Sequence, residues 1–178
     1  MLTHKGTKTI ETKRLILRKA QPEDAKAMFQ NWASDEDVTR YLTWPAHESV
    51  EITQMVLQSW LDSYSSPDYY QWLIVPKEMG QPIGSISVVR QNADLAEIGY
   101  CIGKSWWHQG FTSEALAAVI GYLFTEVGFA RLEARHDPRN PNSGYVMKKC
   151  GMRYKETTYG TDRNNQGICD CVRYEILK

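Results

Sequence analysis

Residues 108–113 form a short glycine-containing stretch with the character of a phosphate-binding turn. The stretch follows an apolar run with strand character and leads directly into a segment with helical periodicity. The first turn of a helix has free backbone N–H groups and the positive end of the helix dipole, and both attract anions. We therefore expect a phosphate group of a ligand to bind here. The residues concerned are His108, Gln109, Gly110, Phe111, Thr112 and Ser113.

Other residue types with reactive side chains do not form a pattern of this strength. His108, His136 and Cys150 are types used in nucleophilic catalysis, but no spacing supports such a set, and Cys150 precedes Gly151 at an expected helix end. No group of His, Cys, Asp and Glu has the spacing of metal ligands. We therefore predict no metal site.

The periodicity of apolar residues predicts the elements that position this turn. Before it we expect a strand at 14–18, helices that begin near 21, 35 and 49, and an antiparallel meander of strands at 70–75, 83–90 and 95–102. After it we expect a helix at 113–127, a strand at 131–136, a last helix capped by Asn142 or Ser143, and strands at 152–159 and 169–177.

These elements predict one α/β (α+β) domain at residues 10–178, preceded by a flexible leader at 1–9. The expected sheet is mixed, mostly antiparallel and six- to seven-stranded, with about four to five flanking helices.

Composition excludes several classes of protein. The formal net charge is zero, which argues against a dedicated nucleic-acid binder. No run approaches the ~20 apolar residues of a membrane span, and the polar N-terminus has no signal segment. The cysteines number four and lack the spacing of a disulfide framework, so we expect a cytoplasmic protein.

Three further stretches have the form of a family signature: ETKRLILR at 11–18, EIGYCI at 97–102, and NPNS at 140–143 leading to KCGM at 149–152. With these stretches and this order of elements, the chain resembles the GNAT superfamily of acetyl-CoA-dependent N-acetyltransferases. Within it, the chain is similar to the RimJ/RimL-like branch, which acetylates N-terminal amines of ribosomal proteins. The resemblance implies that the strands at 95–102 and 131–136 splay into a V that holds the thioester of acetyl-CoA.

The superfamily's pyrophosphate loop, Arg/Gln-x-x-Gly-x-Gly/Ala, falls on residues 107–112 of this chain. Only Gly110 matches, since Trp107 and Thr112 replace the usual residues. The contacts of such a loop come mainly from backbone N–H groups, and a Cβ at Gly110 would crowd the phosphate. Near the C-terminal signature lies a basic group that comprises Lys148, Lys149, Arg153 and Lys155. Such a group is typical of a solvated face, and the alternative is that it binds the CoA 3′-phosphate.

The same resemblance assigns residues to the pantetheine arm. The backbone of Tyr100, Cys101 and Ile102 is expected to pair with it as an added strand would. Asn140 matches an asparagine that hydrogen-bonds the pantetheine in the family.

For catalysis, the resemblance offers two carboxylates and one hydroxyl. Glu97 and Glu133 are the candidates for the general base, with a structural carboxylate as the alternative for each. Ser143 is the candidate acid for the leaving thiolate, with helix capping as its alternative. The family's usual tyrosine on this helix is replaced by Met147.

Aromatic residues of the first half are expected to line the acceptor site, and they are Trp32, Tyr41, Trp44, Tyr70 and Trp72. The sequence thus predicts acetyl transfer to a primary amine, most simply an N-terminal α-amine. Two alternatives stay open: detoxification of a small amine or antibiotic, and a non-catalytic acyl-CoA sensor. The branch commonly dimerises, which leaves a homodimer as one option.

Overall fold

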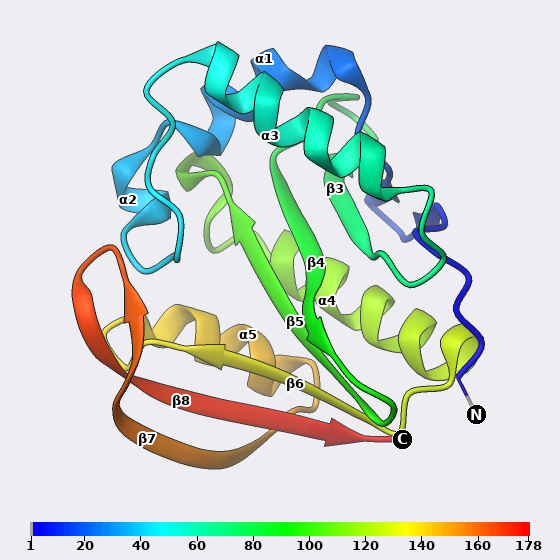
Figure 1. Cartoon of the computed structure of the whole chain (residues 1–178), viewed down its shortest axis with the longest axis vertical. Helices are drawn as coiled ribbons and strands as arrows, with labels where there is room; N and C mark the ends of the chain where they lie inside the picture. The colour runs from blue at the N-terminus through cyan, green and yellow to red at the C-terminus, as the bar shows by residue number, and fades with distance from the viewer. Residues whose placement is uncertain (1) are drawn as a thin grey trace.

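A single sheet of eight strands forms the centre of the protein, as a computed structural model that describes residues 2–178 shows (Figure 1). The strand order is β1-β2-β3-β4-β5-β6-β8-β7. The bounds are β1 Ile10–Glu11, β2 Leu15–Arg18, β3 Gln71–Pro76, β4 Gly84–Gln91, β5 Leu95–Ile102, β6 Arg131–His136, β7 Arg153–Asn164 and β8 Gly167–Leu177. We expected six to seven strands; the eighth is β1, whose two residues are too few to give a periodic pattern.

Neighbouring strands pair antiparallel everywhere except between β5 and β6. The parallel pairing joins Leu95–Glu97 to Arg131–Glu133 and then stops. Beyond that point β5 stays paired with β4 up to Ile102, and β6 stays paired with β8 up to His136. The two central strands therefore diverge as the expected V, which is visible where β5 and β6 separate in Figure 1.

Helices cover both faces of the sheet. The α-helices are α1 Ala25–Met28, α2 Glu36–Thr39, α3 Val50–Ser63, α4 Phe111–Tyr122 and α5 Pro141–Lys149. Short 3₁₀ turns lie at Pro22–Asp24 and Lys104–Trp106, and π turns at Phe29–Ala33 and Leu123–Val127. One apolar cluster joins α1 and α3 to Leu73 and Val75 of β3, and a larger one joins α4 to the opposite face. Within residues 2–178, none of the helices has the length and apolar character needed to span a membrane.

The segment before β1, which we predicted to be a loose leader, lies against the body of the domain. Gly6 N donates to Pro67 O, and the Thr7 hydroxyl donates to Tyr69 O at 2.9 Å. The Trp72 indole donates to Lys8 O at 2.6 Å. These long-range bonds were invisible to the sequence, because a polar segment without periodicity carries no signal of its tertiary partners.

The last helix begins earlier than predicted. Asn140, not Asn142 or Ser143, precedes its first residue, and Pro141 occupies the first turn, where its missing N–H costs nothing. Ser143 therefore lies inside the helix, and its side chain does not cap it.

Candidate active site

A cavity of about 480 Å³ opens where β5 and β6 diverge. One wall comes from β4 and β5, and another from the end of β6 and the start of α5. The hairpin of β7 and β8 closes one side, and the loop between α2 and α3 closes another. The sheet thus gathers residues from both halves of the chain around one space.

On the side of β5 that faces the V, no strand of residues 2–178 pairs with its backbone beyond Glu97, which leaves an edge open to a ligand. Tyr100, Cys101 and Ile102 lie on this stretch, and the first two line the cavity. Burial raises the pKa of the Cys101 thiol, whose sulfur lies 3.5 Å from the Ser85 hydroxyl. The free edge can accept an extended polar chain as an added strand, and Cys101 stays a neutral thiol beside it.

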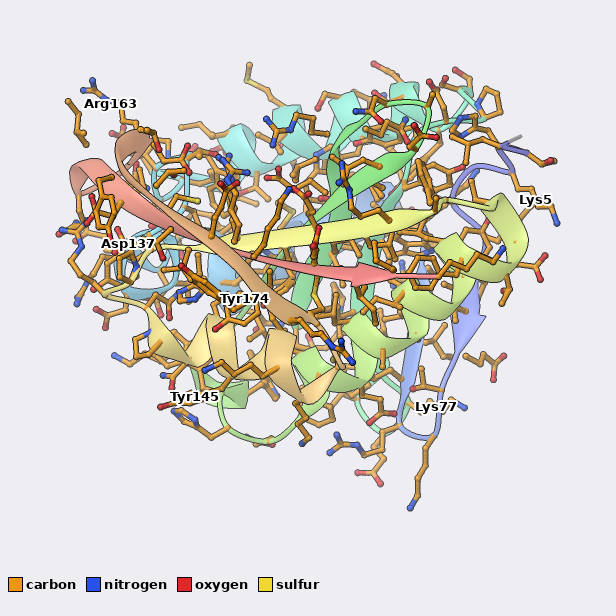
Figure 2. All side chains as sticks on the ribbon, turned by 90° about the horizontal axis from the view of Figure 1, so that it is seen from below. Lys5, Lys77, Asp137, Tyr145, Arg163 and Tyr174 are labelled. Carbon is orange, nitrogen blue, oxygen red and sulfur yellow. The ribbon has the colours of Figure 1, made fainter. Side chains whose placement is uncertain are left out.

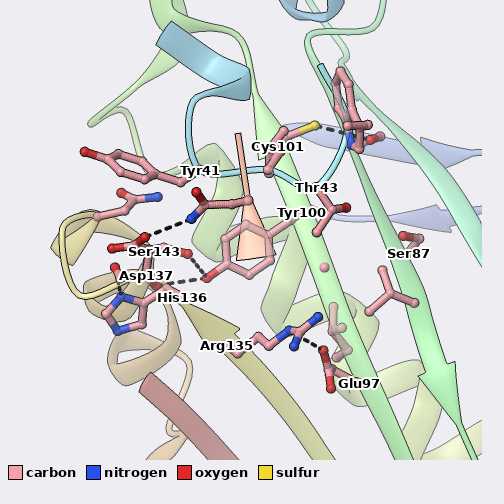
Figure 3. Close-up of a pocket in the computed structure, with 18 of the residues that line it drawn as sticks. Tyr41, Thr43, Ser87, Glu97, Tyr100, Cys101, Arg135, His136, Asp137 and Ser143 are labelled. Atoms are coloured by element: carbon pink, nitrogen blue, oxygen red, sulfur yellow. Dashed lines mark hydrogen bonds and ion pairs between the residues drawn. The ribbon is translucent and has the colours of Figure 1, made fainter. Parts of the chain in front are cut away.

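Tyr100 and Ser143 meet across the V (Figure 3). The Tyr100 hydroxyl donates to Ser143 O at 2.9 Å, and the Ser143 hydroxyl donates to the Tyr100 oxygen at 3.1 Å. Burial raises the pKa of the Tyr100 phenol above its usual value. Asn140 also lines this part of the cavity. A neutral hydroxyl pair therefore spans the gap between β5 and α5.

Glu97 lines the cavity, but its carboxylate is held by three arginines. Arg135 Nε lies 2.9 Å from Glu97 Oε1, Arg173 Nη1 lies 3.7 Å from Oε2, and Arg90 Nη2 also pairs with Oε2. The pairing register shifts between Val88 and Arg90, which is a β-bulge opposite this position. Both carboxylate oxygens are thus engaged, with the side chain 2% exposed.

Glu133 does not reach the cavity lining. Its carboxylate is buried and pairs with Lys155 Nζ at 2.6 Å and with Arg131 Nε at 3.6 Å. Although Glu97 and Glu133 are register partners on β5 and β6, only Glu97 lines the cavity. Of the two predicted bases, Glu133 is therefore the one whose carboxylate pairs with cations outside the cavity lining.

The predicted phosphate turn has the backbone of an anion site. Gly110 precedes α4 with φ +79°, a conformation that favours glycine, and no side chain caps the first N–H groups of the helix. His108 also has positive φ, at +61°. The Trp107 indole donates to Ile102 O at 2.9 Å, so the atypical tryptophan ties the turn to the end of β5.

Two cations that lie beside Gly110 come from distant parts of the chain. An ideal Cβ at Gly110 would lie 3.4 Å from Arg14 Nη2 and 3.8 Å from Lys149 Nζ. Arg14 is fixed by Glu114 at 2.7 Å and donates to Gln109 O at 3.0 Å. Lys149 belongs to the predicted basic group, whereas Arg14 belongs to the signature stretch at 11–18, where nothing in the neighbouring sequence indicates that it lies beside Gly110.

The five aromatic residues predicted to line the acceptor site do not lie together. Tyr41 and Trp44 line the cavity. Trp32, Tyr70 and Trp72 do not, because all three are essentially fully buried in the apolar clusters around β3. Large aromatic side chains on a central strand and its covering helix supply core area, which the pattern of aromatics could not separate from a cleft. Tyr145, on α5, is exposed and points outward (Figure 2).

Residues that the sequence did not single out line the other side of the cavity. Asp137 follows β6, and its carboxylate accepts from Arg139 and, at 2.8 Å, from Asn164 on the hairpin. The Arg139 guanidinium holds the Asp137 pKa down at about 2. Asp162 of the hairpin pairs with Arg135 at 2.9 Å. Within residues 2–178, no group of three His, Cys, Asp or Glu side chains is arranged to hold a metal ion.

Comparison with known proteins matches the chain to acetyltransferases. Residues 14–153 match the family model described as an acetyltransferase (GNAT) domain. The uncharacterized N-acetyltransferase p20 of Bacillus licheniformis is 30% identical, with 96% of both chains covered. The uncharacterized N-acetyltransferase YoaA of Bacillus subtilis is 34% identical, covering 95% of this chain and 96% of its own.

A solved structure shares the fold at lower identity. RimL, described as a ribosomal L7/L12 alpha-N-protein acetyltransferase in complex with coenzyme A, superposes with a TM-score of 0.85 and 20% identity. The match covers 96% of this chain and 98% of that one.

Proposed function

Because the chain belongs to the GNAT family and is thus an acetyl-CoA-dependent N-acetyltransferase, we propose that its acceptor is the α-amine of a peptide or protein N-terminus. The observation that carries this proposal is the state of the two predicted bases. Glu97 is engaged by arginines through both oxygens, and Glu133 lies outside the cavity lining.

An acceptor that loses its proton readily suits such a site. An α-amino group has a pKa of roughly 7.7–8.0, whereas a lysine side chain has a pKa of about 10.4. Near neutral pH a useful share of an α-amine is already uncharged, so a weak base or a water chain suffices. A lysine acceptor would need a dedicated base, and neither of the carboxylates we predicted is free to act as one.

We propose that acetyl-CoA lies along the free edge of β5 with its diphosphate at residues 108–113. The uncapped N-terminus of α4, with Arg14 and Lys149 beside Gly110, supports the diphosphate position. The edge of β5 at Tyr100, Cys101 and Ile102 supports the pantetheine position, because its pairing with β6 ends at Glu97; the Ile102 carbonyl there accepts from the Trp107 indole.

In this arrangement the amine nitrogen attacks the thioester carbon, and the C–S bond then breaks. A backbone N–H near Cys101 or Ile102 stabilises the oxyanion. The Ser143 hydroxyl gives its proton to the leaving thiolate and regains one from the proton that the acylated nitrogen releases, directly or through water. The Tyr100 oxygen that it faces at 3.1 Å orients the hydroxyl. Most of the acceleration comes from holding the two reactants together.

A small cationic amine is the second candidate, and the observation in its favour is the acidic lining of the cavity. Asp137, Asp162 and Asp170 lie there with Glu97. The first two, like Glu97, are paired with arginines. Most of the negative charge is therefore compensated, which ranks this candidate second.

The test is a panel of acceptors with release of CoA thiol as the readout. It contains peptides that differ only in the first residue, the same peptides with a blocked N-terminus and an internal lysine, and polyamines and aminoglycosides. We expect turnover only with free N-termini. Turnover confined to small amines would refute the proposed acceptor.

The cytoplasm is the proposed compartment, since the four cysteines are unpaired thiols. They are Cys101, Cys150, Cys169 and Cys171.

A further inference from the structure

One residue at the tip of the β7–β8 hairpin joins the two walls of the cavity. The two hydrogens of Asn165 Nδ2 go to Thr39 O and Trp44 O, each at 2.8 Å. Its backbone N–H goes to Leu42 O at 3.1 Å. Asn165 thus bonds three carbonyl groups of one segment that is more than a hundred residues distant in sequence. Figure 1 shows the hairpin tip beside the loop that follows α2.

The segment it holds is the part of the cavity wall that begins at the end of α2. Tyr41, Leu42, Thr43, Trp44 and His47 all line the cavity. In the part of the chain that the structure describes, the hydrogen bonds that reach residues 41–45 from other segments all come from Asn165. The next anchor along the chain is His47, whose N–H donates to Ala33 O at 2.8 Å. Trp44 also packs against the apolar cluster of α1, α3 and β3, and Arg139 lies over the Tyr41 ring. The hairpin tip therefore supplies the hydrogen bonds that hold this wall from another segment.

The turn itself does not need the Asn165 side chain. Asn164 supplies the turn bond, since its Oδ1 accepts from Gln166 N at 2.8 Å. Gly167 supplies the positive φ, at +96°. Asn164 Nδ2 also fixes the hairpin to Asp137 at 2.8 Å. Asn164 therefore holds the hairpin to Asp137, and Asn165 holds the segment at 39–44 to the hairpin.

We infer that Asn165 is a positioning residue for the acceptor: its carboxamide clasps the loop at 39–44 to the hairpin and so sets the width of the acceptor end of the cavity. The inference rests on the proposed function only in taking this end as the acceptor's. Among the described residues, neither Asn165 nor the segment at 39–44 has a hydrogen bond to the proposed CoA site at residues 108–113 and on β5. Loss of the clasp should weaken acceptor binding and leave acetyl-CoA binding unchanged.

Two substitutions remove the clasp in different ways. Asn165→Asp is isosteric, removes both Nδ2 donors and places carboxylate oxygens against two carbonyl oxygens. Asn165→Ala removes the donors without adding charge. Gln166→Glu is the matched control, because it adds the same charge at the neighbouring exposed position, whose side chain has no hydrogen-bond partner in the described residues.

Hydrogen exchange of residues 38–48 and steady-state kinetics test the inference together. We expect faster hydrogen exchange in both Asn165 variants and a rise in acceptor KM of about 5- to 30-fold. Each lost hydrogen bond shifts the equilibrium between the held and the released segment by about a few-fold or more. The acetyl-CoA KM and kcat should stay within about twofold, and Gln166→Glu should match the wild type in every measurement.

Two results would overturn the inference. One is unchanged exchange in the loop after loss of the carboxamide. The other is faster exchange with an unchanged acceptor KM, which would make the contact merely structural. The assay uses whichever acceptor the wild-type enzyme acetylates best in the panel. If that acceptor is a small amine, the proposed acceptor fails while the clasp is still tested on the amine that reacts.

Discussion

Replacing Gly110 tests the proposed diphosphate site most directly. Gly110 has φ +79° immediately before α4, and an ideal Cβ there would lie near Arg14 and Lys149 rather than near other backbone. A side chain at position 110 therefore clashes with no backbone of the protein itself. A residue other than glycine must, however, adopt the unfavourable left-handed conformation. Asn and Asp tolerate this conformation better than other residues do. The pair Gly110→Asn and Gly110→Asp thus differs in charge and hardly in shape.

The expected magnitudes follow from this geometry. Both variants should lose about 1 kcal/mol of stability from the left-handed backbone, or roughly 2–4 °C in Tm for a domain of this size. A carboxylate about 6 Å from a phosphate charge is repelled by about 3 kcal/mol at an effective dielectric constant of 20. That corresponds to roughly a hundredfold weaker binding for Asp than for Asn.

Titration calorimetry with CoA measures the difference, and thermal melting confirms that both variants fold. The gap between the two should narrow as salt is raised, because exposed charges are screened. If Gly110→Asp bound CoA as tightly as Gly110→Asn, the diphosphate would lie elsewhere.

Four further predictions follow from particular contacts. Glu97→Gln should lower the free energy of unfolding in urea by about 2 kcal/mol, less than the roughly 3–5 kcal/mol of a fully buried ion pair, because Arg90 and Arg135 reach solvent. A changed pH–rate profile at unchanged stability would instead make Glu97 the base. Ser143→Ala should lower kcat about tenfold and leave the acetyl-CoA KM unchanged. The effect is smaller than usual for a general acid because a thiolate leaves readily. An unchanged kcat would mean that Ser143 takes no part in proton transfer. Gly84→Ala should destabilise the protein by about 2–3 kcal/mol in thermal melts, since its Cβ would press on Cys101 O and lie 2.9 Å from Ile102 Cα. In the same melts Gly121→Ala should stabilise α4 by about 0.5–1 kcal/mol, because a Cβ there would meet nothing within 4 Å beyond its own helix and chain neighbours. Because the Asp137 pKa is lowered to about 2, its contribution to stability is complete above its ordinary value of 3.8 and is lost as pH falls through about 2; melts between pH 2 and 6 should show wild type above Asp137→Asn at pH 6 and the two converging near pH 2.

Local periodicity was enough to predict much of the fold. The meander of β3, β4 and β5, the helix after Gly110 and the final hairpin all follow from alternation, helical spacing and turn residues. The glycine at the start of α4 was also readable, because a left-handed residue before a helix leaves a local signature. Elements shorter than a period, such as β1 and the broken turns around α1, were not readable in this way.

Family resemblance supplied the V between β5 and β6 and the residues along it. Tyr100, Ser143 and Asn140 do line one cavity, although they lie on different elements. Their roles toward acetyl-CoA stay proposals, and the Gly110 and Ser143 variants test two of them.

What the sequence determined by itself is the longer helices and strands, the glycine turn before α4 and the strand that carries Tyr100 and Cys101, since each depends on neighbours within a few residues. Only the tertiary structure decided which side chains face the cavity. It buried Trp32, Tyr70 and Trp72, engaged Glu97 with arginines, and brought Arg14 to Gly110 and Asn165 to the segment at 39–44. The physical reason is that burial and charge pairing depend on partners far away in the chain, and a single sequence carries no local signal of such partners.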